Sequence, residues 1–130
     1  MKPVIKMQSV VLDCKQPKEL AKFYMELLGG EVVYEIEGYF TGIAVPGETA
    51  GISFQMNEDY VPPVWPDSPG EQMKMEHLDF KVNDMEEAVQ YALSLGAIKP
   101  SVQYWQPGYG PQWVTLLDPA GHPFCLCKHD

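Results

Sequence analysis

The chain has 130 residues, the usual size of one domain and enough to bury a hydrophobic core. Hydrophobic residues make up 45% and charged residues 21%, which is typical of globular proteins and excludes a disordered chain. Nine basic residues stand against eighteen acidic ones, and the formal net charge of -9 argues against nucleic-acid and anionic-membrane partners. The same charge favours a cationic ligand, although solubility alone would also explain it.

The sequence predicts a cytoplasmic protein. No apolar stretch reaches the length of a membrane span, and the first residues lack the apolar core of a signal peptide. Three cysteines are present, Cys14, Cys125 and Cys127. The last two share a face of a predicted strand, where they are poorly placed to bridge each other. Reduced thiols therefore fit best.

The first half of the chain predicts a strand, a helix and three further strands. Alternation predicts the first strand over residues 7–14, and Pro17 suits the first turn of a helix. Apolar residues then recur at helical spacing, at Leu20, Phe23, Tyr24, Leu27 and Leu28. Gly29 and Gly30 end this helix. Strands are expected over residues 31–35, 40–45 and 51–56.

The second half repeats this order after a segment rich in proline and aromatic residues. The expected single domain has a first module over about residues 4–57, a linker over about 58–75 and a second module over about 76–130. Alternation predicts a strand over 77–82, and Asp84 with Glu87 resembles a capping box at the start of a helix that Gly96 ends. Strands are expected over residues 98–103, 113–117 and 123–128.

The two halves match in register, which indicates an internal duplication. The predicted fold is α+β, with two tandem βαβββ modules whose curved sheets form a partly open, barrel-like cavity with the helices outside. Alternation places apolar side chains on the helix side of each sheet. The opposite side gathers mostly polar or reactive side chains, in a set made up of Ser9, Val11, Asp13, Ser53, Gln55, His77, Asp79, Cys125 and Cys127. A polar concave surface of this kind is a candidate ligand site.

Three motifs resemble the vicinal oxygen chelate superfamily (glyoxalase/bleomycin resistance protein/dioxygenase). They are Val10-Val11-Leu12-Asp13 with Leu27-Leu28-Gly29-Gly30, then His77-Leu78-Asp79-Phe80-Lys81-Val82 with Leu95-Gly96, and finally Asp118-Pro119-Ala120-Gly121-His122-Pro123-Phe124. The resemblance covers nearly the whole chain and is greatest to small glyoxalase-like domain proteins. It implies a homodimer with a pocket for a small molecule.

The resemblance also implies where a divalent metal would bind. Metal-dependent members use His or Glu at four strand positions, which here are Ser9, Ser53 (or Gln55, two residues along), His77 and Cys125. Only His77 is a usual ligand for the octahedral metals of glyoxalases and dioxygenases. We therefore expect no metal cofactor and no glyoxalase I activity; if a metal is present, His77 and Cys125 are its expected ligands.

Each candidate residue also has a structural interpretation. His77 is the best catalytic candidate, as a general base or a ligand partner, or it is a histidine satisfied by the backbone. Asp79 orients His77, meets a cationic ligand, or pairs with a lysine. Cys125 is a soft metal ligand that could share Zn²⁺ with His77 and either Asp79 or Cys127, a nucleophile, or a small buried residue. His122 is interpreted as structural.

Aromatic residues gather in the linker and around the last hairpin. They are expected either to wall the pocket, for a flat or cationic ligand, or to pack in loops or a dimer interface. They are Tyr60, Trp65, Tyr104, Trp105, Tyr109 and Trp113.

Three functions follow from these residues. The preferred one is a metal-free, small-molecule-binding protein like the bleomycin-resistance members that the chain resembles. The alternative is a metal-dependent lyase, isomerase or dioxygenase-like enzyme that uses His77. The third is a regulator that binds a partner through the same cavity.

Overall fold

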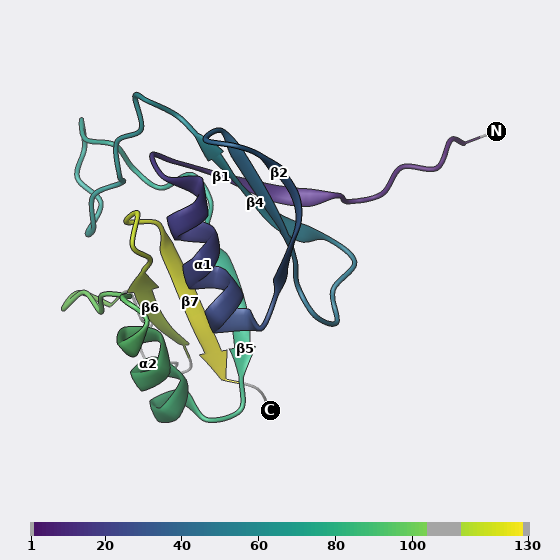
Figure 1. Ribbon diagram of the computed structural model, residues 1–130. Coiled ribbons are helices and arrows are strands. Elements are labelled where there is room, and N and C mark those ends of the chain that lie inside the picture. Colours follow the sequence, from purple (N-terminus) through teal and green to yellow (C-terminus); the bar gives the residue numbers. More distant parts are fainter. Residues whose placement is uncertain (1, 104–112, 129–130) are drawn as a thin grey trace. The chain divides into compact units, whose positions relative to one another are not determined.

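The computed structural model describes residues 2–103 and 113–128, which fall into two compact units. The first unit ends at Tyr60 and the second begins at Val61. The described strands form two separate hydrogen-bonded sheets, one in each unit, each accompanied by a helix (Figure 1). This is the α+β, tandem-module fold that the internal duplication predicts. Neither described helix is long and apolar enough to cross a membrane.

The first unit contains a four-stranded sheet in the order β1-β4-β3-β2. Its elements are β1 (Ser9–Cys14), α1 (Pro17–Leu28), β2 (Glu31–Ile36), β3 (Phe40–Ala44) and β4 (Gly51–Met56). Strand β1 runs parallel to β4, whereas β3 is antiparallel to both of its neighbours. Strand β2, at the edge, is exposed along its whole length.

Helix α1 covers one face of this sheet because its apolar stripe meets the apolar residues of the strands. The buried Tyr24 ring stacks on the buried Phe54 ring, with 5.5 Å between centroids. Gly29 ends the helix with a φ of 79°, a left-handed conformation that glycine adopts without a Cβ clash. The helical stripe and its glycine stop are therefore confirmed.

The second unit contains a three-stranded sheet in the order β5-β7-β6. Its elements are β5 (Leu78–Val82), α2 (Met85–Ser94), β6 (Trp113–Leu117) and β7 (Pro123–Lys128). Helix α2 packs against β7, and the Asp84 side chain accepts a hydrogen bond from the backbone N–H of Glu87 at 3.0 Å. The helix start predicted at Asp84 is thus confirmed.

The strand predicted over residues 98–103 is wrong. Only Ile98 forms a bridge there, to Leu117 of β6. Pro100 has no N–H to donate to a ladder. The Gln103 side chain instead bonds both backbone groups of Thr115, accepting from its N–H at 2.8 Å and donating to its carbonyl oxygen at 3.0 Å. A side-chain amide therefore takes the place of a fourth strand in this part of the second unit.

Candidate functional site

The pairing of β5, β6 and β7 brings polar side chains from three strands together. Asp79 is the register partner of Cys125 on the parallel neighbour, and Thr115 is the antiparallel partner of the same cysteine. Directly paired residues point to the same face of a sheet. The opposite face is apolar, with the Phe80 and Phe124 rings 5.9 Å apart. One face of this sheet is therefore core, and the other carries the reactive groups.

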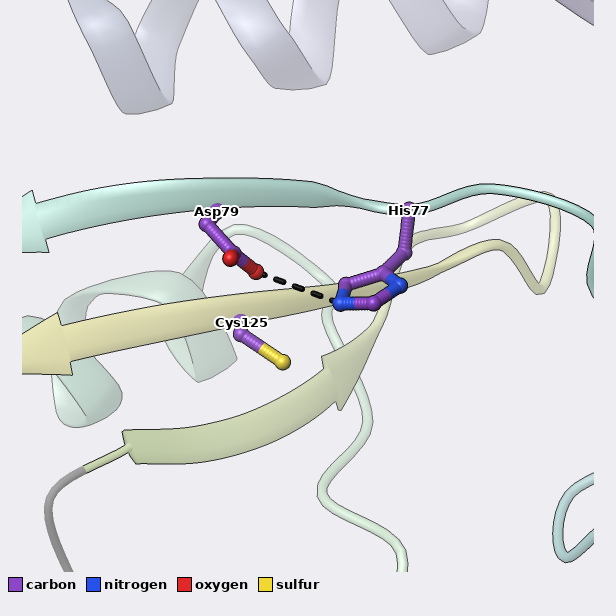
Figure 2. A group of neighbouring side chains, drawn as sticks. All are labelled: His77, Asp79 and Cys125. Atoms are coloured by element: carbon purple, nitrogen blue, oxygen red, sulfur yellow. Dashed lines mark ion pairs between the residues drawn. The ribbon is translucent and has the colours of Figure 1, made fainter.

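His77, Asp79 and Cys125 come together on the reactive face (Figure 2). The imidazole Nε2 of His77 lies 3.3 Å from Asp79 Oδ1, and the three candidate ligand atoms all lie within 4.8 Å of one another. The side chains of His77 and Asp79 are 38% and 62% exposed, so both remain accessible. Asp79 thus pairs with His77, whereas the sequence also left open a pair with lysine.

The Cys125 thiol is the buried member of this group. The residue is 7% exposed, and its Sγ lies 3.3 Å from the Thr115 hydroxyl. Burial raises the pKa of the Cys125 thiol above its ordinary value; the hydrogen bond with Thr115 opposes this rise, and the Asp79 carboxylate adds to it. Burial likewise raises the pKa of Cys127. Both groups are therefore thiols near neutral pH, which disfavours either one as an unassisted nucleophile.

A hollow of about 490 Å³ opens over the reactive face. This volume lies within the range of roughly 300–1,000 Å³ that is usual for small-molecule sites. Its described lining residues come from the three strands and their ends, and are His77, Asp79, Trp113, Cys125, Cys127 and Lys128. The hollow thus combines an acid, a base, two thiols and one large aromatic ring.

The candidates of the first half belong to the first unit. The Ser53 hydroxyl donates to the Ser9 hydroxyl at 3.1 Å, and Ser53 is only 5% exposed. Both line a smaller hollow of about 220 Å³ beside Gly42. Gln55 lies two residues along β4, opposite Phe40, and is not among the residues that line this hollow.

The described aromatic candidates, Tyr60, Trp65 and Trp113, make different contacts within their own units. Trp113 lines the larger hollow. Trp65 makes its contacts within the second unit: its Nε1 donates to the Val102 carbonyl oxygen at 2.8 Å, and Lys74 Nζ lies 5.1 Å from the ring centroid. Tyr60, at the end of the first unit, donates its backbone N–H to Asn57. Tyr104, Trp105 and Tyr109 lie outside the described residues.

Two residues of the site are absent from the sequence-based candidates. Thr115 contacts Cys125, and its position two residues after Trp113 on one strand was a usable signal of a shared face. Lys128 lines the hollow from the end of β7, and no pattern in the sequence indicates this. His122, interpreted as structural, has its Nδ1 2.9 Å from the buried Asp118 carboxylate.

The four positions to which the resemblance assigns a metal do not fit an octahedral cation. Such cations bind imidazole, carboxylate and water, whereas two of these positions are serines whose hydroxyls bond each other. A third is the Cys125 thiol, a soft donor. Only His77 matches the expected donor type.

Comparison with family models identifies one family. The family described as glyoxalase-like domain matches residues 9–127. No curated protein sequence matches the chain. A glyoxalase/bleomycin resistance protein/dioxygenase family enzyme from Burkholderia phytofirmans PsJN has a similar structure, with a TM-score of 0.69 and 17% identity over 95% of this chain and 98% of that chain.

Two further solved structures share the fold. One is a mutant of the fosfomycin resistance protein FosX from Listeria monocytogenes, complexed with Mn(II) and 1S,2S-dihydroxypropylphosphonic acid, with a TM-score of 0.70 and 14% identity over 96% of this chain and 90% of that chain. The other is lactoylglutathione lyase from Agrobacterium tumefaciens, with a TM-score of 0.62 and 17% identity over 98% of this chain and 96% of that chain. The chain therefore belongs to the glyoxalase-like domain family.

Proposed function

We propose that this protein binds a small organic molecule in the hollow of its second unit, without the octahedral divalent metal of metal-dependent relatives. One observation carries the proposal: His77, Asp79 and Cys125 converge within 4.8 Å at a hollow of about 490 Å³. Convergent polar groups in a concave, partly aromatic site are the usual features of small-molecule binding.

The lining favours a ligand with a flat ring and a positive charge. The Asp79 carboxylate is 62% exposed and can accept a hydrogen bond from a ligand while it contacts His77. Trp113 offers an aromatic face on which a ring or a cation gains contact. The net charge of -9 adds a long-range electrostatic field that also attracts cations. Lys128, at the end of β7, is positively charged and would repel a cation. The cation is therefore expected near the Asp79 carboxylate.

A matched set of probes tests this proposal. Benzamidine, benzamide and benzoate share a ring and differ in charge, and each is titrated by calorimetry into reduced protein in the presence of EDTA. We expect saturable binding in the order benzamidine, then benzamide, then benzoate. Asp79→Asn should weaken benzamidine binding on the order of tenfold, because a charge-assisted hydrogen bond is lost.

Glu71→Gln is the control for that variant, because it makes the same change of net charge at an exposed residue that does not line the hollow. It should leave benzamidine binding unchanged. Equal weakening of benzamidine binding by both variants would show that the effect comes from the net charge and not from contact with the Asp79 carboxylate. Failure of all three probes to bind would contradict a ligand site of this chemistry.

A second candidate function is a metal-dependent lyase, isomerase or dioxygenase-like enzyme in which His77 acts as a base. The observation that favours it is the accessible His77–Asp79 pair, in which the carboxylate can orient the imidazole. Mn(II) in the FosX mutant structure is consistent with metal use in this superfamily. Activity that is lost with EDTA and restored by a divalent metal would favour this function over metal-free binding.

We also propose a cytoplasmic homodimer. All three cysteines are free, which fits a reducing compartment. The family resemblance supports the dimer, since its members close their sites by pairing modules within a chain or between chains.

A further inference from the structure

We propose that the second unit alone forms a site for a thiophilic divalent cation, Zn²⁺, with His77 Nε2, Asp79 Oδ1 and Cys125 Sγ as its three protein ligands. The proposal adds a cation to the hollow on which the proposed function rests. It differs from the four-position arrangement implied by the family resemblance, because it uses Asp79 and takes no ligand from the first unit.

The three donor atoms are close to a metal-binding arrangement. They all lie within 4.8 Å of one another. Zinc bonds of about 2.0 Å to nitrogen and about 2.3 Å to sulfur, in a tetrahedron, place ligand atoms about 3.5 Å apart. The required contraction is small, and it falls on the exposed side chains of His77 and Asp79, which can rotate toward the buried Cys125.

The donor chemistry selects the cation. One imidazole, one carboxylate and one thiolate suit Zn²⁺, whereas Mg²⁺ and Mn²⁺ prefer sites of oxygen ligands. Cation binding would release the Cys125 thiol proton to solvent, because only the thiolate binds the metal. Since β5 and β7 are paired strands with Asp79 beside Cys125, the sheet holds two of the three ligand positions in place. The contact between His77 Nε2 and Asp79 Oδ1 already places the third ligand atom, His77 Nε2, beside these two positions.

Three protein ligands leave one tetrahedral position open, as in catalytic rather than structural zinc sites. All three proposed ligands line the hollow of about 490 Å³, from which the open position would be filled. A donor atom of a bound organic molecule, or water, would fill it. Cys127 also lines the hollow, and we assign it to the wall rather than to the metal.

Cobalt provides a spectroscopic test, because Co²⁺ replaces zinc and reports both geometry and thiolate ligation. Reduced, chelator-stripped protein is titrated with Co²⁺ and then with Zn²⁺. We expect one Co²⁺ per chain, the intense visible bands of a tetrahedral site, a sulfur-to-cobalt charge-transfer band, and displacement by Zn²⁺. Cys125→Ser should remove the charge-transfer band. Asp79→Asn and His77→Gln should each weaken Co²⁺ binding on the order of tenfold or more.

Cys127→Ser and Ser9→Ala are the matched controls and should keep the full spectrum, and circular dichroism confirms that each variant is folded. Absence of stoichiometric Co²⁺ and Zn²⁺ binding to the folded wild-type protein overturns the proposal. So does an octahedral spectrum without the sulfur band, or a band that disappears in Cys127→Ser and survives in Cys125→Ser.

The benzamidine titration in EDTA separates this proposal from the proposed function. A protein that binds benzamidine and no Zn²⁺ refutes only the cation site. A protein that binds Zn²⁺ and none of the organic probes refutes only the metal-free ligand site.

Discussion

Asp118 is a buried carboxylate in the turn between β6 and β7. It is 1% exposed, and its Oδ1 accepts hydrogen bonds from the backbone N–H groups of Ala120 and His122, each at 2.9 Å. The His122 ring lies at the same carboxylate. A buried carboxylate is stable only with such partners. The turn that connects β6 and β7 therefore depends on this one side chain.

Asp118→Ala should lower the free energy of unfolding by roughly 2–4 kcal/mol, because two backbone donors and the His122 ring lose their acceptor. Urea unfolding followed by circular dichroism measures the change. Asp59→Ala, at an exposed residue, is the control and should change the value by less than about 0.5 kcal/mol. Equal effects of the two variants would contradict the role assigned to Asp118.

At the same scale, the sequence could predict which residues share a face but not how they meet. Alternation around Leu78 and Phe80 correctly placed His77 and Asp79 together. Two residues along a strand are separated by roughly 6.5 Å, so direct contact between them was not expected from the backbone. Their side chains nonetheless meet at 3.3 Å, from a position just before β5 and a position within it. Such contacts depend on rotamers, which spacing does not determine.

Among the elements, helix α2 is stabilised by the side chains at its first turn. Its N-cap Asp84 accepts from the Glu87 N–H, and Glu86 and Glu87 place negative charge near the positive end of the helix dipole. Helix α1, by contrast, begins with Pro17 and lacks a side-chain cap at Gln16. The two equivalent helices therefore begin by different means.

Asp84→Ala should destabilise the protein by about 1 kcal/mol, the usual effect of removing an N-cap acceptor. Asp84→Ser retains an acceptor oxygen and should restore most of that stability. Thermal unfolding of the three proteins gives the comparison. Similar losses in the alanine and serine variants would show that the acceptor is not the stabilising group.

The wrongly predicted strand shows where pattern reasoning fails at this scale. Ile98 and Val102 are strand-forming residues, but they are 61% and 38% exposed, and Pro100 lies between them. The Gln103 amide supplies the hydrogen bonds that a neighbouring strand would give to Thr115. Hydrophobic periodicity does not reveal a side-chain amide that makes the hydrogen bonds of a backbone peptide group.

For the whole molecule, the internal duplication was the most informative feature of the sequence. Apart from the strand expected over residues 98–103, it predicted the order of elements in both units, because each unit repeats one strand–helix–strand plan. It could not predict that the chemistry of the units would diverge, with a hydrogen-bonded serine pair in one and a His–Asp–Cys group in the other. The order of strands and helices along the chain follows from the hydrophobic pattern. The choice of ligand depends instead on a few polar residues that the fold does not require.

An NMR titration of ¹⁵N-labelled, reduced protein with benzamidine in EDTA tests the central claim most directly, because it locates the ligand without assuming any metal. We predict saturable shifts centred on the backbone amides of His77, Asp79, Cys125 and Cys127 and on the indole of Trp113, with little change at Asp59 and Glu71. Absence of saturable shifts, or shifts centred on Ser9 and Ser53 alone, would contradict a small-molecule site in the second unit.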